Sequence, residues 1–525
     1  MALAENIYKL RERMRLSQEK FAEKLNVSRQ AVQKWESGNS RPDLDKLIAM
    51  SRLFGVTVDF LVSDGWNRFP EAGGGLTAEP NFAGQHPWES YAAQLDVEYR
   101  QCLEEGLEIA EYEPLFSAVG NLKPGKIKSR LADVLYDLVC SLPRREDYPY
   151  SEPSDLEGIR SLSEPIGLPA FRESKKALRE RIAGGWYGRI CGCLLGKPIE
   201  GIRTDELIPL LTETGNYPMH RYILKADLTE EMYARCKFSL RNRCFADTVS
   251  CAPADDDTNY TVLYQLIVEK FGRDFTPANV AEAWTRYQPK SAYCTAERVA
   301  FCNFVKGYCP PDSAVYQNPY REWIGAQIRG DYFGFINPGD PARAAEMAYR
   351  DACISHVKNG IYGELFAAAL MSCAFVCSTA EEMLRGAMGQ IPTTSRLYAE
   401  LDWVLKQYAE GMTAEACFAE IHRRYDEHDG HDWCHTISNA MIVAAALLYG
   451  NGDFGRSICL AVETGFDTDC NGATVGAAVG IWKGVSALSE DWLKPVNGRL
   501  NTQILGVGEV SVDSLIEKTV MHIEG

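Results

Sequence analysis

Two short acidic segments lie more than two hundred residues apart in a chain of 525 residues. The first, DDDTNYT, runs from Asp255 to Thr261, and the second, GFDTDCNG, runs from Gly465 to Gly472. Adjacent carboxylates repel one another unless a cation lies among them. Carboxylate and hydroxyl oxygens are the ligands that hard divalent cations such as Mg²⁺ and Mn²⁺ prefer. If the fold brings both segments together, five carboxylates surround one point, which suits two metal ions about 4 Å apart.

Each acidic segment alone also fits a solvated helix N-terminus, where carboxylates are favourable. The second segment is harder to explain in this way, because glycines and an apolar helical stretch follow it. We therefore expect Asp467 and Asp469 to lie at the start of a buried helix.

Glycines recur at every fourth position in two stretches of helical character. They are Gly184, Gly188, Gly192 and Gly196 in the first and Gly472, Gly476, Gly480 and Gly484 in the second. A glycine inside a helix costs up to about 1 kcal/mol relative to alanine. Close approach of a neighbouring helix backbone offsets such a cost. The pattern predicts two tightly packed central helices, one of which starts with the second acidic segment.

The elements that must position these residues are helices almost throughout, and we expect an all-α fold. Residues 1–64 form a small helical domain, residues 65–87 form a linker rich in glycine, and residues 88–171 form a helical middle segment with a connector. Within that segment we expect helices from Trp88 to Tyr112 and from Lys126 to Leu142. Residues 172–525 form a large helical domain, with one or two short strands near GVGEVSVDSL.

Composition and charge narrow the classes of protein. The net charge of −17 excludes a general nucleic-acid coat protein, yet residues 1–64 carry 11 Lys/Arg against 9 Asp/Glu. Seventeen cysteines without a CxxC pair fit reduced thiols, so we expect a cytoplasmic protein. No apolar stretch is long enough to span a bilayer, and no membrane contact is expected.

The N-terminal stretch LSQEKFAEKLNVSRQAVQKWESG predicts a helix, a short turn and a second helix with outward polar side chains. Residues 4–63 resemble the lambda-repressor/Cro-like (XRE) helix-turn-helix family, with five helices. The resemblance implies binding of double-stranded DNA, as a dimer. It also implies contacts from Gln18 to phosphate and from the second helix to bases, through Ser28, Arg29, Gln30, Gln33 and Lys34. The alternative is a helical bundle used only for dimerisation.

Residues from about 176 to 500 resemble the ADP-ribosylglycohydrolase family. The resemblance rests on GRICGCLLGKPIEG, DDDTNYT, SHVKNGIYGE, WCHTISNAM and ETGFDTDCNGATVGAAVG. It implies an all-α fold with two Mg²⁺ (or Mn²⁺) ions that cleaves the N- or O-glycosidic bond between ADP-ribose and an acceptor. The acceptor would be a protein or a small molecule.

By motif, the resemblance assigns metal binding to both acidic segments and catalysis to Asp256 and Glu200. The metal ligands would be Asp255, Asp256, Asp257, Asp467, Asp469 and Cys470, with Thr258 following the first group. Asp255 and Cys470 depart from the family, which often has Thr or Ser at both positions. A thiol is a poor ligand for Mg²⁺.

Several other residues have both a functional and a packing interpretation. The resemblance implies that His356, Asn359 and Gly360 contact ADP-ribose, although His356 is equally explained as a core histidine. His435 and Asn439 fit packing slightly better than a cleft. The spacing His428-x-x-His431-x-x-x-His435 looks like a metal site, but its surroundings predict an exposed turn. Cysteines in small-residue helices are expected to be core residues, namely Cys191, Cys193, Cys353, Cys373 and Cys377.

Two functions of different classes follow from this sequence. One is a metal-dependent hydrolase that releases ADP-ribose, fused to a DNA-binding module. The other is a transcriptional regulator whose C-terminal domain only senses ADP-ribose or a related nucleotide. The four aspartates Asp256, Asp257, Asp467 and Asp469 favour turnover, while Asp255 and Cys470 keep the sensor in consideration.

Overall fold

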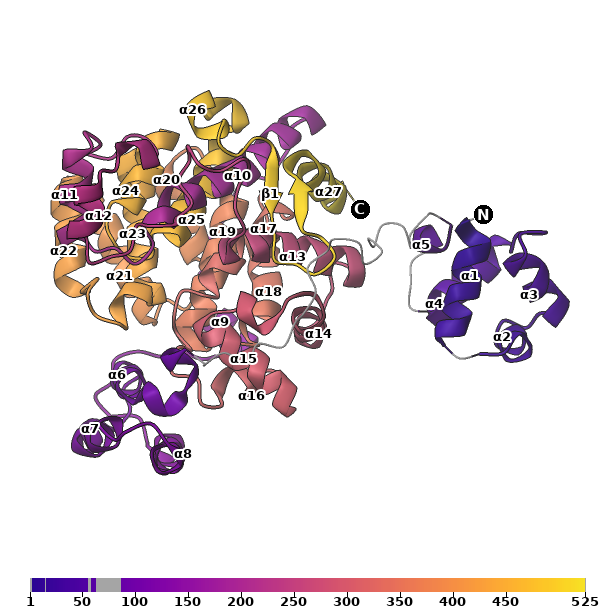
Figure 1. Cartoon of the computed structure of the whole chain (residues 1–525), viewed down its shortest axis with the longest axis horizontal. Coiled ribbons are helices and arrows are strands. Elements are labelled where there is room, and N and C mark those ends of the chain that lie inside the picture. Colours follow the sequence, from indigo (N-terminus) through magenta and orange to yellow (C-terminus); the bar gives the residue numbers. More distant parts are fainter. Residues whose placement is uncertain (1, 15, 55–57, 63–85, 525) are drawn as a thin grey trace. The chain divides into compact units, whose positions relative to one another are not determined.

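The computed structural model describes residues 2–14, 16–54, 58–62 and 86–524. Most of the linker expected at residues 65–87 lies outside these residues. The chain divides into two compact units, Met1–Thr77 and Ala78–Gly525. The expected middle segment belongs to the larger of the two units (Figure 1).

The described residues of the smaller unit form five helices, the number that the sequence predicts. They are α1 (Ala2–Arg13), α2 (Gln18–Lys24), α3 (Arg29–Glu36), α4 (Leu44–Phe54) and α5 (Val58–Val62). Ser17 and Ser28 begin α2 and α3, because each hydroxyl accepts a hydrogen bond from a backbone N–H three residues later. Phe21, Val32 and Trp35 are buried in the core of this unit. Arg29, Gln30, Gln33 and Lys34 of α3 are thereby left on the surface, whereas the Glu36 side chain is buried in an ion pair.

The larger unit is also almost entirely helical. Its first helices are α6 (Leu95–Glu104), α7 (Glu113–Gly120), α8 (Lys126–Ser141), α9 (Leu156–Leu162), α10 (Lys175–Gly196), α11 (Thr204–Glu213), α12 (Glu230–Arg235), α13 (Asp256–Phe271), α14 (Pro277–Tyr287), α15 (Thr295–Lys306), α16 (Asp312–Val315) and α17 (Asp331–Phe335). They continue with α18 (Pro341–Ala352), α19 (Lys358–Ala374), α20 (Ala380–Met388), α21 (Arg396–Ala409), α22 (Ala414–Arg424), α23 (Thr436–Gly450), α24 (Phe454–Val462), α25 (Thr468–Lys483), α26 (Glu490–Leu493) and α27 (Val512–Glu524).

A short hairpin near the C-terminus is the one sheet in the described part of the chain. Strands β1 (Arg499–Asn501) and β2 (Glu509–Ser511) are antiparallel, and Leu500 pairs with Val510. The strand that the sequence placed in GVGEVSVDSL is β2. None of the described helices is both long enough and apolar enough to span a bilayer.

One helix of the middle segment is shorter than the sequence predicts. A single helix was expected from Trp88 to Tyr112, but α6 covers only ten residues of it, and short 3₁₀ turns flank it. Gly106, with φ of 78°, ends the helical path after α6. The predicted second helix agrees with α8.

Helices that are buried on every side form the centre of the larger unit (Figure 1). All residues of α25 from Thr468 to Trp482 are buried, and α19 and α23 are buried along nearly their whole length. Amphipathic helices such as α18, α20 and α21 cover these central helices with one apolar face. The most extensive helix–helix contact joins α10 to α25.

Candidate functional site

The two glycine series of α10 and α25 pack directly on each other in antiparallel order. A methyl carbon added at Gly188 would lie 2.1 Å from the Gly476 carbonyl oxygen, and one at Gly192 would lie 1.9 Å from that of Gly472. No side chain fits at such distances, so glycine is required for this backbone contact. The prediction of two tightly packed helices is confirmed.

This packing brings the start of α25 to the end of α10. Gly196, the last residue of α10, lies against the backbone of Thr468, and the Thr468 hydroxyl donates to its carbonyl oxygen at 3.0 Å. Asp467 is the N-cap residue of α25, and its N–H donates to Asn439 of α23 at 3.2 Å. The second acidic segment therefore begins a buried helix, as predicted, and Asn439 helps to hold it.

The same helix α10 also holds the first acidic segment. Arg189, which is completely buried, donates from Nε and Nη2 to the Asp257 carbonyl oxygen at 3.0 and 2.7 Å. It also forms ion pairs with Asp257 Oδ1 at 3.1 Å and with Asp331 of α17 at 2.6 Å. Asp255 begins α13, because its Oδ1 accepts from the Asp257 N–H at 2.9 Å. One helix thus positions both acidic segments.

The two segments meet at Asp257. Two groups of candidate ligand atoms, each within 4.8 Å of one another, share this residue: Cys193–Asp255–Asp257 and Asp257–Asp469–Cys470. Asp257 Oδ2 and Asp469 Oδ1 are buried and have no hydrogen-bond partner among the described residues. Buried carboxylate oxygens are costly without a partner. This arrangement fits a bound cation.

Burial and mutual repulsion dominate the electrostatics of this acidic centre. Burial, together with neighbouring carboxylates, raises the pKa of Asp256, Asp257 and Asp469 well above the usual range, although Arg189 lowers that of Asp257. Burial also acts on Asp255, but the ion pair with the Lys197 ammonium holds its pKa below the usual value. The centre therefore contains two cations of its own, Lys197 beside Asp255 and Arg189 beside Asp257 Oδ1.

Glu200 belongs to the same centre. It follows the 3₁₀ turn Lys197–Ile199 that extends α10. Burial, followed by the charges of Asp467 and Asp255, raises the pKa of Glu200 to about 7. A carboxyl group with this pKa exchanges a proton readily near neutral pH.

The donor atoms fit a divalent cation, but they do not fit Mg²⁺ equally well at every position. The carboxylates of Asp255, Asp257 and Asp469 are suitable oxygen ligands. Each of the two candidate groups also contains a thiol, from Cys193 or Cys470. Thiolates favour transition metals over Mg²⁺.

Several residues of this centre were not recognised in the sequence. Cys193 was expected to be a core residue, and it is buried, but its sulfur lies beside Asp255 and Asp257. Lys197 follows Cys193 by four residues, about one helical turn, just after the end of α10. This spacing, next to the regularly spaced glycines, was the available signal. The Cys434 thiol, which donates to Asp467 Oδ2 at 3.5 Å, gave no such signal.

The predicted ADP-ribose contacts at His356, Asn359 and Gly360 are buried. Asn359 donates from Nδ2 to Glu152 and Glu322 and accepts from the Leu397 N–H at Oδ1. A methyl carbon at Gly360 would lie 2.5 Å from the Arg321 carbonyl oxygen. These contacts account for Asn359 and Gly360 by packing, and their role in ligand binding stays a prediction.

The histidine cluster separates in the structure. His428 is exposed, whereas His431 and His435 are buried beside Glu104. Nδ1 of His431 accepts from the Trp323 indole, and Nδ1 of His435 accepts from the Ile437 N–H. In the neutral rings Nε2 therefore carries the proton and points at Glu104, so it offers no lone pair to a metal. The exposed turn that the sequence predicts is found at His428, and the prediction is wrong for His431 and His435, which are buried.

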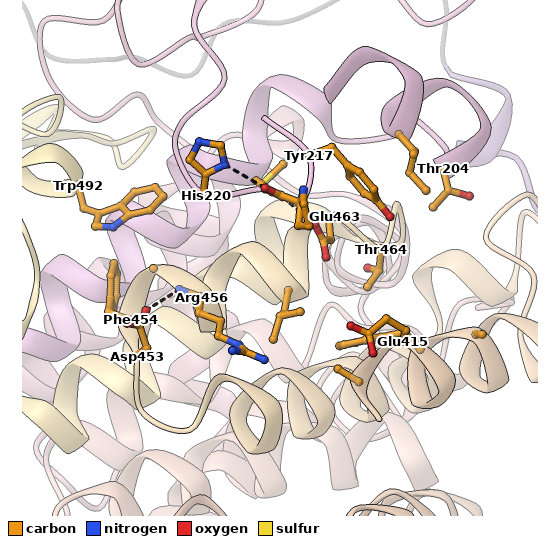
Figure 2. Close-up of a pocket in the computed structure, with 18 of the residues that line it drawn as sticks. Thr204, Tyr217, His220, Glu415, Asp453, Phe454, Arg456, Glu463, Thr464 and Trp492 are labelled. Carbon is orange, nitrogen blue, oxygen red and sulfur yellow. Dashed lines mark hydrogen bonds between the residues drawn. The ribbon is translucent and has the colours of Figure 1, made fainter. Parts of the chain in front are cut away.

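The larger unit has a pocket of about 950 Å³ that none of the predicted site residues lines. Figure 2 shows Tyr217 and His220 across this pocket from Arg456 and Glu415, with Trp492 and Phe454 beside them. The pocket is bounded by α11, α22, α24 and α26.

The predicted DNA-contacting side chains lie on one surface of the smaller unit. Those of α3 and its N-cap are exposed, namely Ser28, Arg29, Gln30, Gln33 and Lys34. Gln18, expected to contact phosphate, donates to Glu36 at 2.8 Å in this structure. Arg29 pairs with Glu19 at 3.0 Å, and both side chains are mostly exposed. DNA contacts by these residues stay predictions.

Fold and site together define an all-α protein with an N-terminal helix-turn-helix and a buried acidic centre. The family model ADP-ribosylglycohydrolase matches residues 174–521, and the helix-turn-helix model matches residues 7–61. The chain belongs to the ADP-ribosylglycohydrolase family and carries a helix-turn-helix module of the kind found in transcriptional regulators.

Two curated relatives match this chain over a short stretch, and both are named as HTH-type regulators. The HTH-type transcriptional activator BcrR of Enterococcus faecalis is 44% identical over 63 residues, which cover 12% of this chain and 31% of that protein. The uncharacterised HTH-type regulator YqaE of Bacillus subtilis is 36% identical over 59 residues, 11% of this chain and 51% of that protein. The chain thus spans about a third to a half of these relatives. A solved structure titled "ADP-ribosylglycohydrolase-related protein complex" aligns over 66% of this chain and 99% of that chain, at 17% identity and a TM-score of 0.39.

Proposed function

We propose that the larger unit is a divalent-cation-dependent hydrolase that releases ADP-ribose from an ADP-ribosylated protein or small molecule. The observation that carries the proposal is the meeting of both acidic segments at Asp257, with the unpartnered oxygens of Asp257 and Asp469 in the same group. Membership in the family makes a glycosidic bond to ADP-ribose the expected target.

The chain's own residues supply the proton transfers. Hydrolysis breaks the bond between the ribose anomeric carbon and the acceptor, and water adds a hydroxyl to the carbon and a proton to the acceptor. In this proposal Glu200, whose pKa burial and the charges of Asp467 and Asp255 raise to about 7, gives a proton to the leaving atom and receives one from water. Asp256, in the first turn of α13, is the second candidate for this exchange.

Positive charge must offset the diphosphate of ADP-ribose in so acidic a unit. A bound divalent cation supplies part of that charge and orients the ribose hydroxyls. Arg203 lies near Asp467 and packs over the Trp433 ring at 4.5 Å, and both side chains are partly exposed. This pair can contact the diphosphate and a base or ribose face.

The test is a product assay on the full-length protein. ADP-ribosyl-arginine and ADP-ribosyl-serine peptides are incubated with Mg²⁺, Mn²⁺ or chelator, and free ADP-ribose is quantified by mass spectrometry. We expect release that chelator removes and that Asp256→Asn reduces at least 100-fold. Asp137→Asn, an exposed change in α8, is the control and should keep full activity. Unchanged turnover in Asp256→Asn would refute the assignment.

The N-terminal module has a separate proposed role as a sequence-specific binder of double-stranded DNA. The exposed Gln and Arg side chains on α3 are able to read base edges in the major groove. A homodimer would present two such helices to one operator.

A regulator that only senses ADP-ribose is the second candidate function. The Lys197–Asp255 ion pair favours it, because it occupies a carboxylate at a predicted ligand position. Tight binding of ADP-ribose without release from either peptide, with every cation tested, would select this function.

A further inference from the structure

We infer that the acidic centre binds a thiophilic transition-metal ion, with the Cys470 thiolate as a ligand beside Asp257 and Asp469. The inference rests on the proposed function in that it concerns the same centre. It goes beyond that function by naming the class of ion and a sulfur ligand.

The carboxylates grouped with Cys470 have two buried oxygens without a hydrogen-bond partner in the described part of the chain. Asp255 already has the Lys197 ammonium as its partner. The two unpartnered buried oxygens, Asp257 Oδ2 and Asp469 Oδ1, belong to the two carboxylates that are grouped with Cys470. Arg189 reaches only the opposite oxygen of Asp257. A single ion beside Cys470 would satisfy both free oxygens at once.

The position of Cys470 makes its sulfur available to such an ion. Cys470 lies in the first turn of α25, directly after Asp469, and is buried. Its sulfur and one oxygen from each of Asp257 and Asp469 lie within 4.8 Å of one another. Ligand atoms around a tetrahedral Zn²⁺ are roughly 3.3–3.5 Å apart for bonds of about 2.0 and 2.3 Å. Side-chain adjustments of about 1 Å therefore suffice.

The chemistry of the donors selects the class of ion. Soft thiolate ligands favour Zn²⁺, Co²⁺ and Fe²⁺, whereas Mg²⁺ requires oxygen ligands and keeps much of its water. A serine or threonine at this position would offer a hard oxygen donor. Cys470 and Cys193, each grouped with Asp257, make the centre softer than its carboxylates alone.

Cobalt reports sulfur ligation directly. The full-length protein is stripped of metal and titrated with Co²⁺, and absorption is recorded in the near ultraviolet, where thiolate-to-cobalt charge transfer occurs. We expect a band that saturates with Co²⁺ in the wild type and in the control Cys417→Ser, a change of a buried cysteine in α22. Cys470→Ser should lose at least nine-tenths of the band. A band that persists in Cys470→Ser would overturn the inference.

X-ray absorption spectroscopy at the zinc edge, on the wild-type protein loaded with Zn²⁺, tests for the sulfur ligand without any variant. We expect one sulfur scatterer at about 2.3 Å from the ion. A shell of only oxygen and nitrogen would overturn the inference. If that shell is found while Mg²⁺ supports release of ADP-ribose, the proposed hydrolase function holds and the inference of a sulfur ligand fails. If sulfur is found and no cation supports release, the ion site stands and the proposed hydrolase fails.

Discussion

Replacing Gly188 by alanine tests whether the contact between α10 and α25 positions the acidic centre. The added methyl carbon would lie 2.1 Å from the Gly476 carbonyl oxygen. Even a close C–H···O contact needs about 3.3 Å, so the two backbones must separate locally by about 1 Å. Overpacking costs about 1–3 kcal/mol, and this clash, between two backbones, belongs at the upper end. Alanine regains at most about 1 kcal/mol in helix propensity. We expect Gly188→Ala to lower the free energy of unfolding by about 2 kcal/mol in total.

The assay is urea unfolding of the full-length protein, followed together with release of ADP-ribose. Gly188→Ala should lower the midpoint of the larger unit and reduce activity, because Thr468 and Asp469 move with α25. Gly120→Ala, in α7, is the matched control, since no atom lies within 4 Å of the added carbon. It should change stability by less than about 0.5 kcal/mol. A Gly188→Ala protein as stable and as active as the wild type would refute the role given to this contact.

Three further predictions concern other parts of the molecule. Lys197→Met leaves the buried Asp255 carboxylate without its cation, so in the absence of metal ions it should lower the free energy of unfolding by about 1–3 kcal/mol. Added Mn²⁺ should raise the thermal midpoint of this variant more than that of the wild type. Burial lowers the pKa of His435 to about 4, so the unfolded chain, with a histidine pKa near 6.5, binds more protons below neutrality. The contribution of neutral His435 to the free energy of unfolding is therefore fully present above about pH 6.5. It is lost as the pH falls toward 4, and about 2 kcal/mol is lost by pH 5. His435→Gln should remove this part of the pH dependence measured by urea unfolding. Gln33→Ala should weaken binding to a selected operator at least tenfold in a gel-shift assay, whereas Lys126→Ala in α8 should not.

Much of the fold could be predicted because its signals are local. The serine caps and apolar spacing of residues 16–41 define α2 and α3 without any tertiary information. The glycine series required a close partner helix, and each series proved to be the partner of the other. The length of α6 was overestimated, because the amphipathic pattern continues past Gly106 although the backbone turns there.

The site could be predicted only in part, because its composition depends on which helix faces meet. The acidic segments were found from their residue types, and the resemblance paired them. Nothing local shows that Arg189 reaches Asp257, or that Cys193 faces carboxylates instead of the core. From the sequence, Asn359 fits both a contact with ADP-ribose and a role in packing. Only the structure shows that its side chain donates to Glu152 and Glu322.

The most direct measurement is an anomalous difference map from a crystal of the protein grown with Mn²⁺. The account predicts a peak between the first turns of α13 and α25, bounded by Asp257 and Asp469. A map with no peak there, or with manganese only at another group of candidate ligands such as Asp426, Glu427 and His428, would contradict it.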